Sequence, residues 1–259
     1  MKPPYKIQKI KKLKSKRKLV CLTAYSKPTA KILDKYCDII LVGDSVATAF
    51  YGMKNTKEIK LDTMIGHSIS VRKGTKKSIM VFDMPFNTYR NIKEAKKNAR
   101  KIFKETHCDA IKLESNGKNF NILKSLVKSG MPVMGHIGYT PQYKGKFKPQ
   151  GLNKGQERKL INEAIKIESS GAFSIVLECI NSDTAKKITE SINIPTIGIG
   201  SSNACDGQIL VIDDLIGLSG FYPKFVKKYA DLEKILNNAL KRFRSDVIRT
   251  KFPTKANTY

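Results

Sequence analysis

The chain has 259 residues, 49 of them basic and 22 acidic, which gives a formal net charge of +27. Hydrophobic residues make up 41% and charged residues 27%, which is typical of a folded globular protein and excludes a disordered chain. No apolar run approaches the roughly 18 residues of a membrane span, and no signal-peptide core follows the basic start. Five scattered cysteines, with no C-x-x-C pair, argue against a disulfide scaffold. We therefore expect a cytoplasmic protein without a membrane partner.

The two ends of the chain carry much of the excess basic charge. Residues 2–18 contain nine Lys or Arg side chains and no acidic one. Such a segment binds polyanions without specificity, so a basic nucleic-acid-binding protein is one alternative. The chain has neither an aromatic RNA-recognition cluster nor zinc-finger spacing, which favours a solvated basic surface and no specific nucleic acid. Ile7, Ile10 and Leu13 recur at three-residue spacing, so residues 1–18 are expected to be a helical extension.

Short, β-branched apolar runs then alternate with helix-like segments. Near-continuous hydrophobic runs are typical of parallel strands that are covered on both faces. The expected strands are Leu19–Ala24, Asp38–Gly43, Ser78–Met84, Asp109–Glu114, Pro132–Ile137, Phe173–Glu178, Ile194–Ile199 and Ile209–Asp213. Eight such strands with intervening helices predict an α/β (β/α)8 TIM barrel, with an open doubly wound sheet as the alternative. We expect one domain over residues 1–259, a closing helix over Tyr222–Phe243 and a C-terminal tail from about residue 244.

Polar residues end several of these runs, where parallel barrels carry their active sites. Four carboxylates from four strands would converge at one mouth, and such close like charges need a cation or protonation. Mg²⁺ with oxygen ligands is the economical solution. A single Asp at a strand end can instead be a turn former, and His136 can be an ordinary core histidine. The candidate residues at these strand ends are Asp44, Ser45, Asp83, Lys112, Glu114, His136 and Glu178.

The order of the motifs resembles the ketopantoate hydroxymethyltransferase family. The resemblance extends from about Lys6 to Tyr229, and the combination of motifs is specific although no single motif is. The motifs are Leu22-Thr23-Ala24-Tyr25, Leu41-Val42-Gly43-Asp44-Ser45, Asp83-Met84-Pro85-Phe86, Lys112-Leu113-Glu114, Pro132-Val133-Met134-Gly135-His136-Ile137-Gly138 with Thr140-Pro141-Gln142, Val176-Leu177-Glu178-Cys179, and Ile194 to Gly200 followed by Cys205-Asp206-Gly207-Gln208.

This resemblance implies a barrel of the phosphoenolpyruvate/pyruvate type with an N-terminal helix. It implies transfer of a hydroxymethyl group from methylenetetrahydrofolate to α-ketoisovalerate (3-methyl-2-oxobutanoate), through a Mg-stabilised enolate, to form ketopantoate in pantothenate and coenzyme A biosynthesis. It also implies a homo-oligomer, typically a decamer. By resemblance, Mg²⁺ is held by Asp44, Asp83 and Glu114. The keto acid is contacted by Ser45 and Lys112, together with Asp44, Asp83 and His136. The resemblance assigns the role of base to Glu178.

The residue chemistry is consistent with these roles. An apolar strand precedes Glu178, and apolar surroundings raise a carboxyl pKa toward the value that suits a general base. Lys112 is expected to lower the pKa of Glu114, which leaves Glu178 as the carboxylate best suited to act as the base. His136 is the next candidate. A magnesium-dependent 2-oxo acid C–C lyase or isomerase on the same barrel is a further alternative. The chain departs from the family pattern at Ser26, Ser115, Asn116, Ser201 and Asp213.

Overall fold

A computed structural model describes residues 5–145, 147–220 and 222–259 of the chain. Residues 1–4 of the expected N-terminal extension therefore lie outside the described residues. The chain divides into two compact units, Met1–Val211 and Ile212–Tyr259, and each is described by itself below.

The first unit is built on eight parallel strands that close into a barrel. Each strand pairs with the next along the chain, and β8 pairs with β1, where Leu19 lies opposite Gly207. The predicted (β/α)8 barrel is thus confirmed, and the open sheet is not formed. The strands are β1 (Leu19–Thr23), β2 (Ile39–Val42), β3 (Ile79–Asp83), β4 (Ala110–Glu114), β5 (Val133–Gly138), β6 (Ser174–Glu178), β7 (Thr196–Ile199) and β8 (Gly207–Leu210).

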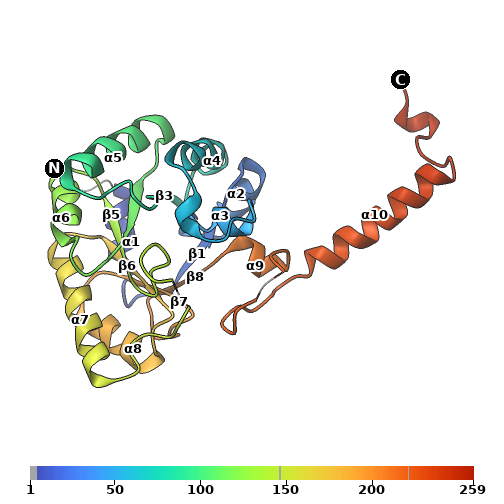
Figure 1. Cartoon of the computed structure of the whole chain (residues 1–259). Coiled ribbons are helices and arrows are strands. Elements are labelled where there is room, and N and C mark those ends of the chain that lie inside the picture. Colours follow the sequence, from blue (N-terminus) through green and yellow to red (C-terminus); the bar gives the residue numbers. More distant parts are fainter. Residues whose placement is uncertain (1–4, 146, 221) are drawn as a thin grey trace. The chain divides into compact units, whose positions relative to one another are not determined.

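Helices connect most of these strands and lie around the barrel (Figure 1). Asn91 and Asn153 cap the longest of them, α5 and α7, by accepting the backbone N–H of Glu94 and Gln156. Such caps satisfy N–H groups that the first helical turn leaves unpaired. The helices of this unit are α1 (Tyr5–Lys11), α2 (Lys27–Leu33), α3 (Val46–Ala49), α4 (Leu61–Gly74), α5 (Ile92–Thr106), α6 (Phe120–Lys128), α7 (Lys154–Ser169) and α8 (Ser182–Ser191), with the 3₁₀ turn η1 (Thr56–Glu58).

The eighth strand lies earlier in the chain than the sequence pattern predicts. It spans Gly207–Leu210, whereas Ile212 and Asp213 already belong to the short helix α9 (Ile212–Ile216). A glycine ordinarily weakens a strand. Here a side chain at Gly207 would stand only 2.7 Å from the Cβ atom of Leu19 on β1, so the close approach of the two backbones requires glycine.

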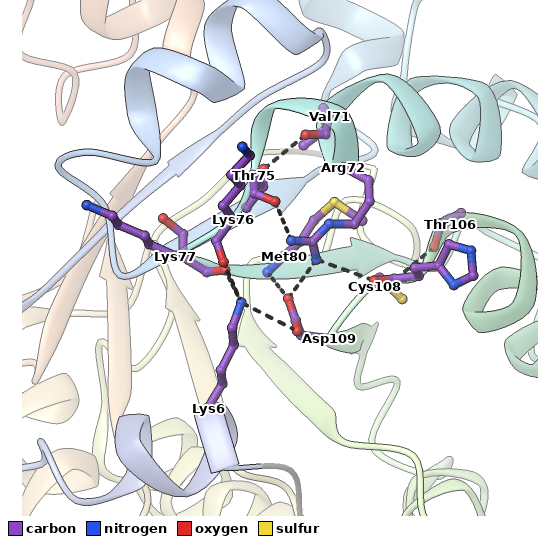
Figure 2. Close-up of polar contacts among 12 residues, drawn as sticks. Lys6, Val71, Arg72, Thr75, Lys76, Lys77, Met80, Thr106, Cys108 and Asp109 are labelled. Carbon is purple, nitrogen blue, oxygen red and sulfur yellow. Dashed lines mark hydrogen bonds and ion pairs between the residues drawn. The ribbon is translucent and has the colours of Figure 1, made fainter.

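Helix α1 closes the amino-terminal end of the barrel. Ile7 and Ile10 are buried in the cluster that contains the first residues of several strands, among them Leu19 and Ile79. Lys6 Nζ donates to the Lys76 carbonyl at 3.0 Å. Figure 2 shows that Lys6 also faces Asp109, at 3.9 Å.

Asp109 organises the segment that receives Lys6. It accepts hydrogen bonds from Arg72 at 3.0 Å and from the backbone N–H of Met80 at 2.9 Å (Figure 2). Lys14 likewise pairs with the buried Asp206 at 2.8 Å. Part of the basic amino-terminal segment, which the sequence predicted to be a helical extension with a solvated basic surface, therefore anchors α1 to the barrel.

The second unit contains α9, α10 (Leu232–Ile248) and the 3₁₀ turn η2 (Lys255–Asn257). Asp231 caps α10 by accepting the backbone N–H of Lys234, so this helix begins later than the expected Tyr222 and continues past Phe243 to Ile248. None of its residues is buried, and an apolar stripe that we call the α10 stripe is exposed: Leu236, Leu240, Phe243 and Val247. Across the described residues, every helix is too short or too polar to be a candidate membrane span.

Candidate active site

The predicted site residues line one cavity at the carboxyl end of the barrel. Asp83, Glu114 and Glu178 end strands β3, β4 and β6, and Asp44 comes just after β2. The cavity has a volume of about 100 Å³. Its walls include all seven candidates from the sequence, namely Asp44, Ser45, Asp83, Lys112, Glu114, His136 and Glu178.

Lys112 and Asp83 form a buried ion pair at the centre of this cavity. Lys112 Nζ lies 2.8 Å from Asp83 Oδ1 and 2.7 Å from Oδ2, and both side chains are almost wholly buried. Burial disfavours the ammonium, but Asp83, Asp44 and Glu114 together outweigh this effect and raise the pKa of Lys112. Burial raises the pKa of Asp83 to about 7 despite the opposing charge of Lys112. The charge of Lys112 thus compensates the carboxylates around it only in part.

His136 lies between two carboxyl groups. Its Nε2 atom is 3.1 Å from Glu178 Oε2, and its Nδ1 atom is 3.6 Å from Glu114 Oε1. Burial lowers the pKa of His136 well below its ordinary 6.5, so the imidazole is neutral at physiological pH. Rather than packing in the core away from the site, His136 lies in the cavity wall.

The two glutamates share an unusually high affinity for protons. Burial raises the pKa of Glu178 to about 8, in line with the direction expected from its sequence context. Burial, followed by the charge of Asp44, also raises the pKa of Glu114 well above 4.5. Lys112 lowers the pKa of Glu114 as predicted, but desolvation and the neighbouring carboxylates exceed this effect, so the net shift is upward.

Several residues of the site received no role from the sequence. Tyr25 hydrogen-bonds Ser45 Oγ at 2.8 Å and so orients it. Gln142, on the loop after β5, donates to Asp44 at 2.9 Å. Both residues lie within the quoted motifs, but nothing in the spacing of a loop residue indicates which distant side chain it contacts.

The donor set fits a hard divalent cation. Four carboxyl groups face one lysine, and Glu114 Oε1 is buried without a hydrogen-bond partner among the described residues. Within the same described ranges, no three His, Cys, Asp or Glu side chains are gathered as a complete metal-ligand set. Mg²⁺ commonly takes only one or two carboxylates and completes its shell with substrate oxygens and water. The chemistry of Asp44 and Asp83 suits this mode of binding.

The fold and the cavity together define a (β/α)8-barrel protein with a carboxylate-rich site at its carboxyl end. Solved structures of low sequence identity share this fold. Phosphonopyruvate hydrolase in complex with oxalate and Mg²⁺ matches with a TM-score of 0.62 at 12% identity, covering 97% of this chain and 93% of that one. A 2,3-dimethylmalate lyase of the PEP mutase/isocitrate lyase superfamily matches with a TM-score of 0.63 at 12% identity, covering 98% and 88% of the two chains.

Sequence comparison identifies the family. Residues 4–255 match the family model for ketopantoate hydroxymethyltransferase. The 3-methyl-2-oxobutanoate hydroxymethyltransferase of Pelagibacter ubique (strain HTCC1062) is 52% identical over 254 residues, which are 98% of this chain and 99% of that protein. The protein of the same name from Anaplasma marginale (strain Florida) is 45% identical, over 95% of this chain and 90% of that protein. The chain belongs to the ketopantoate hydroxymethyltransferase family.

Proposed function

We propose that this protein transfers a hydroxymethyl group from methylenetetrahydrofolate to α-ketoisovalerate and forms ketopantoate for pantothenate biosynthesis. The observation that carries the proposal is the 52% identity, over nearly the whole of both chains, to a relative named for this activity. The cavity supports it independently, because it combines a carboxyl group of raised pKa with a buried ammonium group. Since the methylene carbon of the folate carries no oxygen, the hydroxyl oxygen comes from water, and tetrahydrofolate is the second product.

Glu178 takes the proton from C3 of the keto acid. A general base works best when its pKa lies near the working pH, and the pKa of about 8 at Glu178 meets that condition. The Nε2 atom of neutral His136 lies 3.1 Å from Glu178 Oε2 in the same cavity wall. C3 of the resulting enolate then forms the new carbon–carbon bond with the methylene carbon, whose two bonds to folate nitrogens break. Water supplies the hydroxyl group, and the two nitrogens of tetrahydrofolate take up the C3 proton and the remaining proton of water.

Lys112 holds a positive charge next to the position where the keto acid becomes negative. Preorganised charge in a dry cavity is one of the largest contributions to catalysis, and the ion pair with Asp83 fixes the position of Lys112 Nζ. Asp44 and Asp83, with Glu114, would hold Mg²⁺. When bound, Mg²⁺ supplies Lewis-acid polarisation of the keto oxygen. Ser45, held by Tyr25, contacts the keto acid.

The enzyme is proposed to act in the cytoplasm as a homo-oligomer, a decamer by analogy with its family. All five cysteines are buried free thiols, which suits a reducing compartment. The exposed α10 stripe supports self-association, because an apolar stripe of this kind on a helix without buried residues is typical of an interaction surface.

Product analysis tests the proposal. We expect ketopantoate from α-ketoisovalerate only when methylenetetrahydrofolate and Mg²⁺ are both present, and its loss with EDTA. Glu178→Gln removes the base and should lose this activity. Its matched control is Glu105→Gln, at an exposed position on α5, which should retain full activity. Cleavage or isomerisation of a 2-oxo acid without folate would instead support the lyase alternative. Absence of ketopantoate from the complete mixture would overturn the proposed reaction.

A further inference from the structure

Gln142 occupies a place in the site that the proposed reaction leaves unexplained. It lies on the loop that follows β5, and only 1% of its surface is exposed. The loop is turned by Gly138, whose φ of +98° favours glycine. A side chain at this position would stand 2.1 Å from the Glu178 carbonyl oxygen. The tight turn therefore directs the loop back so that Gln142 reaches Asp44 and Glu114.

The Gln142 side-chain amide makes hydrogen bonds to three other residues. Its Nε2 donates to Asp44 Oδ2 at 2.9 Å and to the Met84 carbonyl at 3.1 Å. Its Oε1 accepts the hydroxyl of Tyr89. In addition, the backbone N–H of Gln142 donates to Glu114 Oε2 at 3.0 Å. One residue thus contacts two of the carboxylates in the cavity.

The orientation of this amide follows from the chemistry of its partners. The Met84 carbonyl can only accept a hydrogen bond, so the NH₂ end of the Gln142 amide has to face it. The oxygen end is then directed to Tyr89, which donates. Tyr89 is itself buried, and burial raises its pKa well above 10, so its hydroxyl keeps its proton. Tyr89 therefore fixes the amide in the orientation that presents a donor to Asp44.

These contacts leave specific oxygens for other ligands. Gln142 engages Oε2 of Glu114, whereas Oε1 of the same carboxyl group has no hydrogen-bond partner among the described residues and belongs to a residue that lines the cavity. The hydrogen bond to Asp44 Oδ2 similarly limits rotation of the Asp44 carboxylate. Outer contacts of this kind orient the groups that bind a metal.

We propose that Gln142 is a positioning residue, which together with Tyr89 holds Asp44 and Glu114 in the orientation that binds a divalent cation and the keto acid. This inference rests on the proposed function, because it assigns the purpose of the orientation to that reaction. Gln142 acts only through the two carboxylates that it contacts.

Two variants test this role by different routes. Gln142→Met keeps the length of the side chain but removes all three hydrogen bonds of the side-chain amide, and Tyr89→Phe removes only the hydroxyl that orients the amide. Isothermal titration calorimetry with Mn²⁺ alone, without keto acid, measures the affinity directly. The Mg²⁺ concentration for half-maximal exchange of the α-ketoisovalerate C3 proton in D₂O provides the second readout. Loss of a hydrogen bond that orients a metal ligand costs roughly 10–100-fold in metal affinity. In Gln142→Met we therefore expect the Mn²⁺ Kd and the Mg²⁺ concentration for half-maximal exchange to rise by about that factor. In Tyr89→Phe both should rise as well.

Thr196→Val is the structural control. Thr196 begins β7 at the other end of the barrel and bonds the buried Asp206 through its hydroxyl at 3.1 Å, so this variant should lower the unfolding midpoint without changing metal affinity per folded molecule. The positioning role is overturned if folded Gln142→Met and Tyr89→Phe bind Mn²⁺ within twofold of the wild type. It is also overturned if Thr196→Val weakens metal binding as much as they do. The two proposals can fail separately. If the wild type shows no proton exchange but the variants bind Mn²⁺ more weakly than the wild type does, the proposed reaction is refuted and the positioning role is upheld.

Discussion

The raised pKa of Glu178 makes the stability of the metal-free protein depend on pH. The carboxyl group has a pKa of about 8 in the folded protein against an ordinary value of 4.5. Between these values the folded protein holds a proton that the unfolded chain has released, so stability falls as pH rises through this window. The full difference between the two pKa values lowers the free energy of unfolding by no more than about 5 kcal/mol at pH above 8.

Glu178→Gln removes this cost, since an amide does not ionise. In EDTA, we expect the variant and the wild type to have similar free energies of unfolding at pH 5. At pH 8.5 the variant should be more stable by one to a few kcal/mol, within the ceiling of about 5 kcal/mol. The contribution of Asp83, whose pKa is about 7, is present in both proteins and cancels in the difference.

Urea unfolding followed by circular dichroism measures this difference at several pH values and one fixed protein concentration. Glu105→Gln, which replaces an exposed glutamate, should follow the wild-type curve throughout. If the difference between Glu178→Gln and the wild type stays constant from pH 5 to pH 8.5, Glu178 does not carry a raised pKa, and the electrostatic account of the site is wrong.

Three further predictions address the metal, the base of the barrel and the oligomer. Asp44→Asn should weaken Mg²⁺ binding at least tenfold in calorimetry while leaving the circular dichroism spectrum unchanged, and wild-type affinity would remove Asp44 from the ligand set. Ile10→Ala should lower the free energy of unfolding by about 2–5 kcal/mol, because it empties a buried position beneath the barrel; a loss below about 0.5 kcal/mol would mean that α1 does not close the barrel. Light scattering at micromolar concentration should give a mass well above 29.1 kDa, and Phe243→Asp in the α10 stripe should reduce it, whereas a monomeric wild type would contradict the oligomer.

The barrel could be predicted because its strands are covered on both faces. A continuous apolar run predicts each strand. The carboxylate at its end, as at Asp83, Glu114 and Glu178, marks the end of the strand where the active site lies. The eighth strand was predicted with its start too late in the chain, because it begins at Gly207, whose role depends on contact with Leu19 on a distant strand. The start of α10 carries a local signal in the capping residue Asp231, which the expected closing helix over Tyr222–Phe243 did not take into account.

The candidate residues could be collected from the sequence, but their electrostatics could not. Alternation along β4 correctly places Lys112 and Glu114 on one face. The pKa of Glu114 depends instead on burial and on Asp44, which is supplied by another strand end. The role of Gln142 depends on a hydrogen bond to Asp44 across 98 positions of the chain. Such a contact leaves no periodic pattern in a loop.

The most direct test of the central claim is the exchange of the C3 proton of α-ketoisovalerate with solvent deuterium, followed by proton NMR in the presence of Mg²⁺ and without folate. The wild type and Glu105→Gln should exchange this proton at equal rates. Glu178→Gln should bind the keto acid and Mg²⁺ but lose exchange by at least about 100-fold, in keeping with the usual contribution of a general base. If Glu178→Gln exchanges the proton at the wild-type rate, Glu178 is not the base, and the proton-transfer role assigned to this cavity wall would pass to His136.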